Sequence, residues 1–190
     1  MPFFAPNAPS TEAAALAAYL EHQCRQLRST VHGLTTAQSR LTPLPSALSL
    51  AGLLAHSAQV VHGWLFGVMK APEPVELSDY EAINAKIGLE GMFSGAEVPD
   101  MSLEDLLAVF DRSVAYIREA EGVAALGAPV PVPDAPWFPD DMVIDARWVW
   151  SHLTTEVARH VGHADLIREA IDGQTAYALN DAVDAESAST

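Results

Sequence analysis

The sequence predicts an all-α protein, and three observations carry this prediction. Apolar residues recur at helical spacing in four long stretches, strand-like alternation of apolar and polar residues is absent, and proline or glycine separates the stretches. A long segment lies between the second and third stretches. Four main helices joined in this way are typical of a four-helix bundle with a crossover connection, in which sites lie between facing helices.

The first part of the chain is expected to hold two long helices and one short turn. Apolar residues repeat at helical spacing over residues 11–32, and a glycine follows. Thr35 and Gln38 resemble a capping box that starts the short turn. The second helix, over residues 49–69, begins at Ser49 as its cap, carries a broad apolar face and is followed by prolines.

Residues 70–101 are long for a connection inside a bundle, so we expect them to form the crossover. Ser78 and Glu81 predict a short capped helix within this segment. The third long helix is expected over residues 102–122, where Ser102 supplies the cap and apolar residues again repeat at helical intervals.

A proline-rich segment precedes the last helix. Its prolines exclude regular structure over residues 129–143, and its Trp137 and Phe138 are placed to cover a pocket. Asp145 can cap the fourth helix, which is predicted over residues 146–172 and is stopped by a glycine.

The chain is long enough for one domain with a sizeable core. It has 190 residues, of which 49% are hydrophobic. We expect a single helical bundle domain over residues 1–175 and an acidic flexible tail over residues 176–190. The single cysteine, Cys24, excludes an internal disulfide.

The charge of the chain argues against two classes of partner. With 10 basic and 25 acidic residues the formal net charge is −15, which disfavours binding to nucleic acid or to an anionic membrane surface. The longest apolar runs are far shorter than a membrane span, and the first residues lack the pattern of a signal peptide. We therefore expect a cytoplasmic protein.

The most informative segment lies within the predicted fourth helix and aligns four polar side chains. At about 100° per residue, with Glu156 at zero, His152 lies near −40°, His160 near +40° and His163 near −20°. Apolar residues flank the same stripe, so these groups point toward the core. Buried imidazoles and a carboxylate need either a hydrogen-bond network or a bound cation.

Helix geometry limits which of these groups can share one ion. Glu156 is four residues from both His152 and His160, but those two histidines are about 12 Å apart along the helix, too far to meet at one ion. Only one of these two pairs can bind the ion, and another helix must supply the remaining ligands. His56 is the natural supplier, because it lies mid-helix beside the apolar face, although alone it reads as a hydrogen-bonded core histidine. His62 lies about 120° from His56, so we expect it at the surface or at an edge.

The same residues carry a resemblance to a known family. The chain resembles the DinB/YfiT-like superfamily of metal-binding helical bundles, and in particular its actinobacterial mycothiol-dependent branch, which includes the N-terminal domain of maleylpyruvate isomerase. The likeness covers most of residues 11–173. Its motifs are Ser49–His56, Arg147–Val149 and, most specifically, Glu156–Glu169.

The resemblance implies a fold, a metal site and a chemistry. The fold would be a four-helix bundle of DinB/YfiT type, with a divalent metal, zinc or nickel, held by His56, Glu156 and His160. Glutamate as the middle ligand is similar to the mycothiol-dependent maleylpyruvate isomerase pattern. The metal would activate mycothiol as a cosubstrate for S-transfer or thiol-assisted isomerisation, since a cation favours the nucleophilic thiolate. Two histidines and one carboxylate leave a coordination position open.

This chemistry implies a small-molecule electrophile and a small thiol as partners, and a homodimer is a separate expectation for the assembly. Maleylpyruvate isomerase carries an additional C-terminal domain, whereas only a short segment follows Gly173 here. That specific isomerisation is therefore the less favoured expectation.

Other polar residues of the fourth helix have open roles. His163 and His152 are candidate catalytic acid/base groups, outer-shell donors to the metal ligands or plain core residues. Arg159 is a candidate for binding an anionic substrate group, and an ordinary ion pair explains it equally well. We read two further pairs at helical spacing as surface charges: Arg168 with Asp172, and Asp165 with Glu169.

Two other function classes compete with thiol transfer. A metal acting as a Lewis acid would suit a thiol-independent lyase, hydrolase or cyclase. In a non-catalytic metal-binding bundle, the polar stripe would only specify packing. An open coordination position beside a pocket favours an enzyme, whereas closed coordination favours the non-catalytic class.

Overall fold

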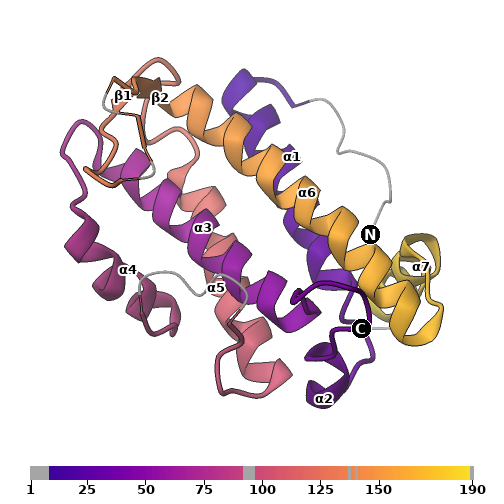
Figure 1. Ribbon diagram of the computed structural model, residues 1–190. Coiled ribbons are helices and arrows are strands. Elements are labelled where there is room, and N and C mark those ends of the chain that lie inside the picture. Colours follow the sequence, from indigo (N-terminus) through magenta and orange to yellow (C-terminus); the bar gives the residue numbers. More distant parts are fainter. Residues whose placement is uncertain (1–8, 92–96, 137, 140, 189–190) are drawn as a thin grey trace.

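The computed structural model describes residues 9–91, 97–136, 138–139 and 141–188, and within these ranges the protein is all-α, as predicted, apart from one very short sheet (Figure 1). The helical elements are α1 (Glu12–Ser29), α2 (Thr36–Ser39), α3 (Leu50–Lys70), the 3-10 helix η1 (Leu77–Asp79), α4 (Tyr80–Ile87), α5 (Leu103–Ala120), α6 (Ala146–Asp172) and α7 (Ala176–Ser187). No helix in the described ranges is both long and apolar enough to cross a membrane.

The long helices begin and end where the sequence predicts caps. The side chains of Ser49, Ser102 and Asp145 each accept a hydrogen bond from a backbone N–H in the first turn of α3, α5 and α6. These bonds satisfy donors that have no partner inside the helix. Gly173 ends α6 in the left-handed conformation, with φ of 78°, which glycine adopts without a steric penalty. Only α1 is clearly shorter than expected, since it ends at Ser29.

Long-range contacts fix the order and direction of the four long helices. α1 packs against α5 and α6, and α3 packs against the same two helices. Arg147 at the start of α6 pairs with Glu12 at the start of α1, so α1 and α6 run in the same direction. Ser113 of α5 donates to the carbonyl of Ala58, and further along both helices Tyr116 meets His62, so α3 and α5 are also parallel. Figure 1 shows the second pair running opposite to the first.

Because α3 and α5 are parallel neighbours, the chain between them must return to the end where α3 began. Residues 71–102 make this return and carry η1 and α4, which packs against α3 and α5. The short helix expected here is present, but its capping box joins Glu76 and Asp79 rather than Ser78 and Glu81.

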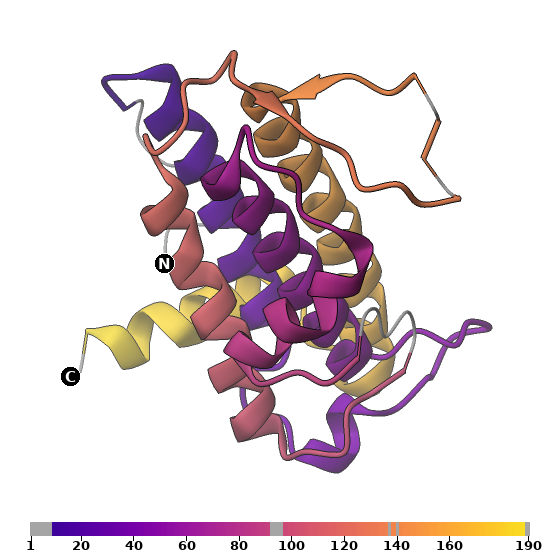
Figure 2. The ribbon, with the colours of Figure 1, turned by 90° about the vertical axis from the view of Figure 1, so that its left-hand side faces the viewer.

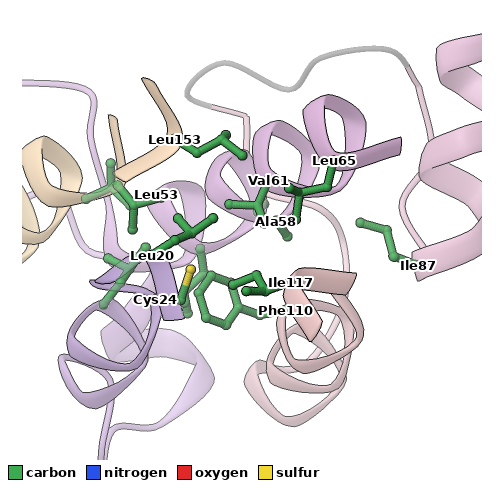
Figure 3. Close-up of a cluster of buried hydrophobic side chains, with 14 of the residues drawn as sticks. Leu20, Cys24, Leu53, Ala58, Val61, Leu65, Ile87, Phe110, Ile117 and Leu153 are labelled. Carbon is green, nitrogen blue, oxygen red and sulfur yellow. The ribbon is translucent and has the colours of Figure 1, made fainter. Parts of the chain in front are cut away.

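The hydrophobic core lies where the four long helices meet (Figure 3). Side chains from all four helices contribute to it, among them Leu20, Cys24, Leu53, Val61, Phe110, Ile117 and Leu153. Burial of these apolar groups is the main force that holds the helices together. Burial also raises the pKa of the Cys24 thiol to about 12, and Glu21 adds to this effect, so the thiol stays protonated and unreactive.

The segment after residue 175 differs from the flexible tail that we expected. It forms α7, which lies crosswise to α1 (Figures 1 and 2). Leu179 is buried, and the side-chain amides of Asn180 and Gln26 exchange two hydrogen bonds of 2.9 and 3.0 Å.

Arg168 is buried, so its interpretation as a surface charge is wrong. Its Nη1 donates to the carbonyls of Thr30 and His32 at 2.7 and 2.8 Å, and its Nε donates to Asp172 at 3.0 Å. Thr30 caps the end of α1 and His32 lies in the turn that follows, so their carbonyls need partners from outside the helix, and the guanidinium supplies several donors at once. Asp165 is half-buried and not fully at the surface, and burial together with Glu169 raises its pKa.

The proline-rich segment before α6 contains some regular structure, contrary to expectation. β1 (Pro129–Val130) pairs antiparallel with β2 (Ile144–Asp145), which leads directly into α6. Proline is tolerated at the first residue of an edge strand because that position needs no ladder donor. Figure 2 shows the segment between the strands as a loop at the end of the molecule where α6 begins.

Candidate functional site

The antiparallel contact between α3 and α6 brings three candidate ligands together. His56 comes from α3, and Glu156 and His160 lie one turn apart on α6. Each offers one ligand atom, and these atoms lie within 4.8 Å of one another. We call these three residues the triad. The predicted convergence of His56 with the Glu156–His160 pair is therefore present in the structure.

The spacing of the triad fits a single small cation. Glu156 Oε1 lies 3.1 Å from His160 Nε2 and 3.6 Å from His56 Nε2. Ligands of a tetrahedral ion bound at about 2.1 Å are themselves about 3.4 Å apart, which both separations match. The two imidazole rings are nearly perpendicular, at 86° with centroids 4.9 Å apart, so neither blocks the other's Nε2. Two imidazoles and a carboxylate form a donor set suited to zinc and similar divalent ions.

The protonation states expected at the triad also suit a metal. Burial alone would raise the pKa of Glu156, but His160 and His56 outweigh it and lower that pKa, which keeps the carboxylate ionised. Burial, and then the neighbouring His56, lower the pKa of His160 although Glu156 opposes them. Metal ligands must be a deprotonated carboxylate and a neutral imidazole, and these shifts favour both.

The remaining candidates on α6 occupy different places around the triad. Arg159 is exposed at the rim of the triad, with its Nη1 3.8 Å from Glu156 Oε2. This distance agrees with the interpretation of Arg159 as an ordinary ion-pair partner. The ring of His163 lies beside that of His160, with centroids 5.8 Å apart. His152 lies one turn before Glu156 and stacks on Trp148, with centroids 4.8 Å apart and planes 16° apart.

We expected His62 at the surface or at an edge, but its side chain is fully buried. Its ring packs edge-on against Tyr116, with centroids 4.1 Å apart, and neither ring nitrogen has a hydrogen-bond partner among the described residues. Burial, reinforced by Lys86, lowers the pKa of His62 to about 4. His62 does lie on a different face of α3 from His56, as the angle between them predicts. However, α5 covers that face, and the sequence of α3 alone does not reveal this.

A cavity of about 190 Å³ adjoins the triad, and Glu156 belongs to both. His152 and Phe138 also line it, so the predicted covering role of Phe138 agrees with the structure, while Trp137 lies outside the described residues. The remaining walls are apolar or aromatic apart from one amide. They are formed by Gln59, Val60, Gly63, Trp64, Leu77, Tyr80 and Pro133.

The sequence contained a signal for part of this cavity wall. Counted from His56, Val60 lies about 40° and Gly63 about 20° from the same helix face, so both had to flank the candidate ligand. Gly63 also lets α4 approach, since a Cβ there would lie 3.0 Å from Tyr80 Cε1. No sequence pattern predicted that Tyr80 lines the cavity, because its position depends on how the 71–102 segment folds back.

A larger cleft of about 640 Å³ lies elsewhere, between α1, α2 and α5, and includes none of the triad residues. Its two arginines are already paired, Arg25 with Glu21 and Arg28 with Asp111. The smaller cavity is the better candidate for chemistry because it alone of the two shares a wall with the triad.

Comparison with known proteins identifies the family. The family model described as mycothiol-S-transferase matches residues 15–173, a range that includes the triad and every residue that lines the adjoining cavity. The chain belongs to the mycothiol-S-transferase family. This confirms the resemblance to the mycothiol-dependent branch that the Glu156–Glu169 segment carries. No curated protein matches the chain.

Proposed function

We propose that this member of the mycothiol-S-transferase family is a divalent-metal-dependent enzyme that transfers mycothiol to a small electrophile. The observation that carries the proposal is the triad, whose donor atoms lie within 4.8 Å of one another beside a cavity. The proposed fold is the DinB/YfiT-type four-helix bundle with its crossover at residues 71–102. The proposed compartment is the cytoplasm, where low-molecular-weight thiols are kept reduced.

The nucleophilic sulfur must come from outside the chain. Cys24 is the sole cysteine, and it is fully buried with a pKa raised to about 12, so it cannot supply a thiolate. A thiol cosubstrate fills this gap, and the family name identifies mycothiol as the candidate. A divalent cation held by His56, Glu156 and His160 would favour the thiolate form of that cosubstrate at neutral pH.

The chain's own residues supply binding and proton transfer. His152 faces the cavity beside Glu156, and burial lowers its pKa although Glu156 opposes this, so a neutral imidazole is available to accept the thiol proton. We assign His163 to support of His160, and exposed Arg159 to the ion pair with Glu156 at the rim of the site. In the transfer, a sulfur–carbon bond forms, the bond from that carbon to its leaving group breaks, and the leaving group departs with the electron pair.

A spectroscopic titration tests the proposal. Protein substituted with cobalt is mixed with mycothiol, and a sulfur-to-metal charge-transfer band is expected to appear as the thiol binds. Thiol depletion is then followed with a model electrophile, and it should require both metal and protein. The absence of any spectral change at saturating mycothiol would contradict the proposal.

The same experiments separate the competing classes. Metal binding without a thiol band would favour a thiol-independent lyase, hydrolase or cyclase, in which the metal acts as a Lewis acid. A stoichiometric metal that neither mycothiol nor water can reach would favour a non-catalytic bundle. The cavity beside Glu156 supports the enzyme classes over the last one.

A further inference from the structure

The cavity beside the triad has a shape and chemistry that select one kind of occupant. Its walls come from α3, α6, the η1–α4 segment and the loop before β2. Glu156 belongs both to this wall and to the triad, and Phe138 contributes to the wall from the loop before β2. A molecule in the cavity therefore lies next to any group bound at the triad.

The walls favour an uncharged aromatic molecule. Trp64 contacts Phe138 edge-on, with ring centroids 5.9 Å apart, and contacts His152 in the same manner at 5.5 Å. These contacts hold the indole as a fixed wall, and aromatic walls attract further rings by stacking or edge-to-face packing. No arginine or lysine lines the described cavity, so no cationic side chain there is available to pair with an anionic molecule.

The volume sets the size of the occupant. A cavity of roughly 150 Å³ holds benzene, and drug-sized ligands need roughly 300 Å³ or more. At about 190 Å³ the cavity has room for a single ring with small substituents. It is too small and too apolar for a sugar-linked thiol such as mycothiol, so the thiol must reach the triad from the solvent side.

We propose that this cavity is the electrophile site and that it selects uncharged electrophiles built on one aromatic ring. The inference rests on the proposed function, because it takes the triad as the place where the thiol is activated. In the reaction, the thiolate sulfur attacks the ring carbon or a benzylic carbon, the carbon–halogen bond breaks and halide leaves with the electron pair. The thiol proton passes to His152 and then to water.

The first test measures binding without catalysis. The probe is para-fluorobenzyl alcohol, an unreactive single-ring compound, followed by fluorine NMR with metal-free protein. Val60→Phe fills the cavity, and the matched control Val143→Phe adds the same ring at a position that is 89% exposed. We expect at least tenfold weaker binding of the probe to Val60→Phe and unchanged binding to Val143→Phe. Equal binding to both variants would overturn the assignment.

The second test measures selectivity with holoenzyme. kcat/KM is compared for chlorodinitrobenzene, which has one ring, and iodoacetamide, which has none. The ratio of the two values should fall at least tenfold in Val60→Phe and stay unchanged in Val143→Phe. An unchanged ratio in Val60→Phe would contradict a ring-selective cavity.

A further variant covers the case in which Val60→Phe does not fold. Phe138→Ala removes an aromatic wall from the loop and should weaken binding of para-fluorobenzyl alcohol several-fold. Full retention of probe binding by this variant would overturn the inference. If the probe binds the cavity as described but no electrophile consumes mycothiol, the proposed function fails and the binding cavity stands, so the two failures are distinguishable.

Discussion

His56 and Glu156 are a hundred residues apart in the chain, yet His56 Nε2 lies 3.6 Å from Glu156 Oε1. The antiparallel packing of α3 on α6 produces this approach, and the helical turn from Glu156 to His160 completes the triad. One ligand therefore depends on tertiary packing and two depend on local helix geometry. Metal binding should be sensitive to any of the three side chains.

We expect His56→Ala, Glu156→Ala and His160→Ala each to lose most of the bound metal. Loss of an outer-shell partner alone weakens metal binding by roughly 10- to 100-fold, and loss of a ligand should cost more. Elemental analysis of purified protein measures the metal, and circular dichroism checks the fold. His32→Ala, in the turn after α1 and beside Glu186 of α7, is the matched control and should keep its metal. Full metal content in folded His56→Ala would exclude the triad.

The turn of α6 before Glu156 carries the residue that we assign to proton transfer. His152 faces the cavity and is held by stacking on Trp148, so it touches a bound substrate without reaching the triad as a ligand. His152→Gln should keep near-stoichiometric metal but lower kcat by roughly a hundredfold, the usual scale for a lost acid/base group. His163→Gln serves as the comparison, because His163 packs beside His160 outside the cavity. A larger kcat loss in His163→Gln would reverse the two assignments.

The sequence predicted the parts of the fold and site that depend on local rules. Caps at Ser49, Ser102 and Asp145 follow from short-range hydrogen bonding, and the spacing of Glu156 and His160 follows from helix geometry. Such features require only neighbours in the chain. His56 was placed with this pair because it lies mid-helix beside the apolar face of α3, and the packing of α3 on α6 brings it there.

The features that the sequence did not predict depend on long-range packing. Arg168 lies among polar residues at helical spacing and resembles a surface charge until the end of α1 is placed beside it. His62 resembles an edge residue until α5 covers it, and Tyr80 enters the cavity only because α4 packs on α3. The periodicity of a sequence shows on which face of a helix a residue lies, but it does not show which neighbouring helix covers that face.

Buried His62 should make stability depend on pH. In the unfolded chain it takes up a proton near pH 6.5, whereas in the folded protein its pKa is lowered to about 4 by burial and by Lys86. The unfolded state therefore binds more protons between these values, so the free energy of unfolding falls as pH decreases from 6.5 to 4. A shift from 6.5 to about 4 corresponds to at most about 3–4 kcal/mol.

Urea unfolding of metal-free protein at several pH values measures this dependence. His62→Gln removes the titrating group, so its stability should fall less steeply between pH 6.5 and 4 even if the variant is less stable throughout. The comparison uses the slope of the free energy of unfolding against pH and not its absolute value. It therefore separates the effect of His62 titration from the effect of lost packing. A variant with the same pH slope as the native chain would show that His62 does not control it.

Docking of α7 should contribute measurably to stability, although its sequence resembles a solvated tail. Asn180 is buried, exchanges two hydrogen bonds with Gln26 and donates to the carbonyl of Ala176. Asn180→Ala removes these bonds inside a contact shielded from water, so we expect a loss of about 1–3 kcal/mol in the free energy of unfolding. Tyr177→Ala, at an exposed position of the same helix, is the matched control and should change it by less than about 0.5 kcal/mol. Equal effects of the two substitutions in urea unfolding would mean that α7 does not dock through Asn180.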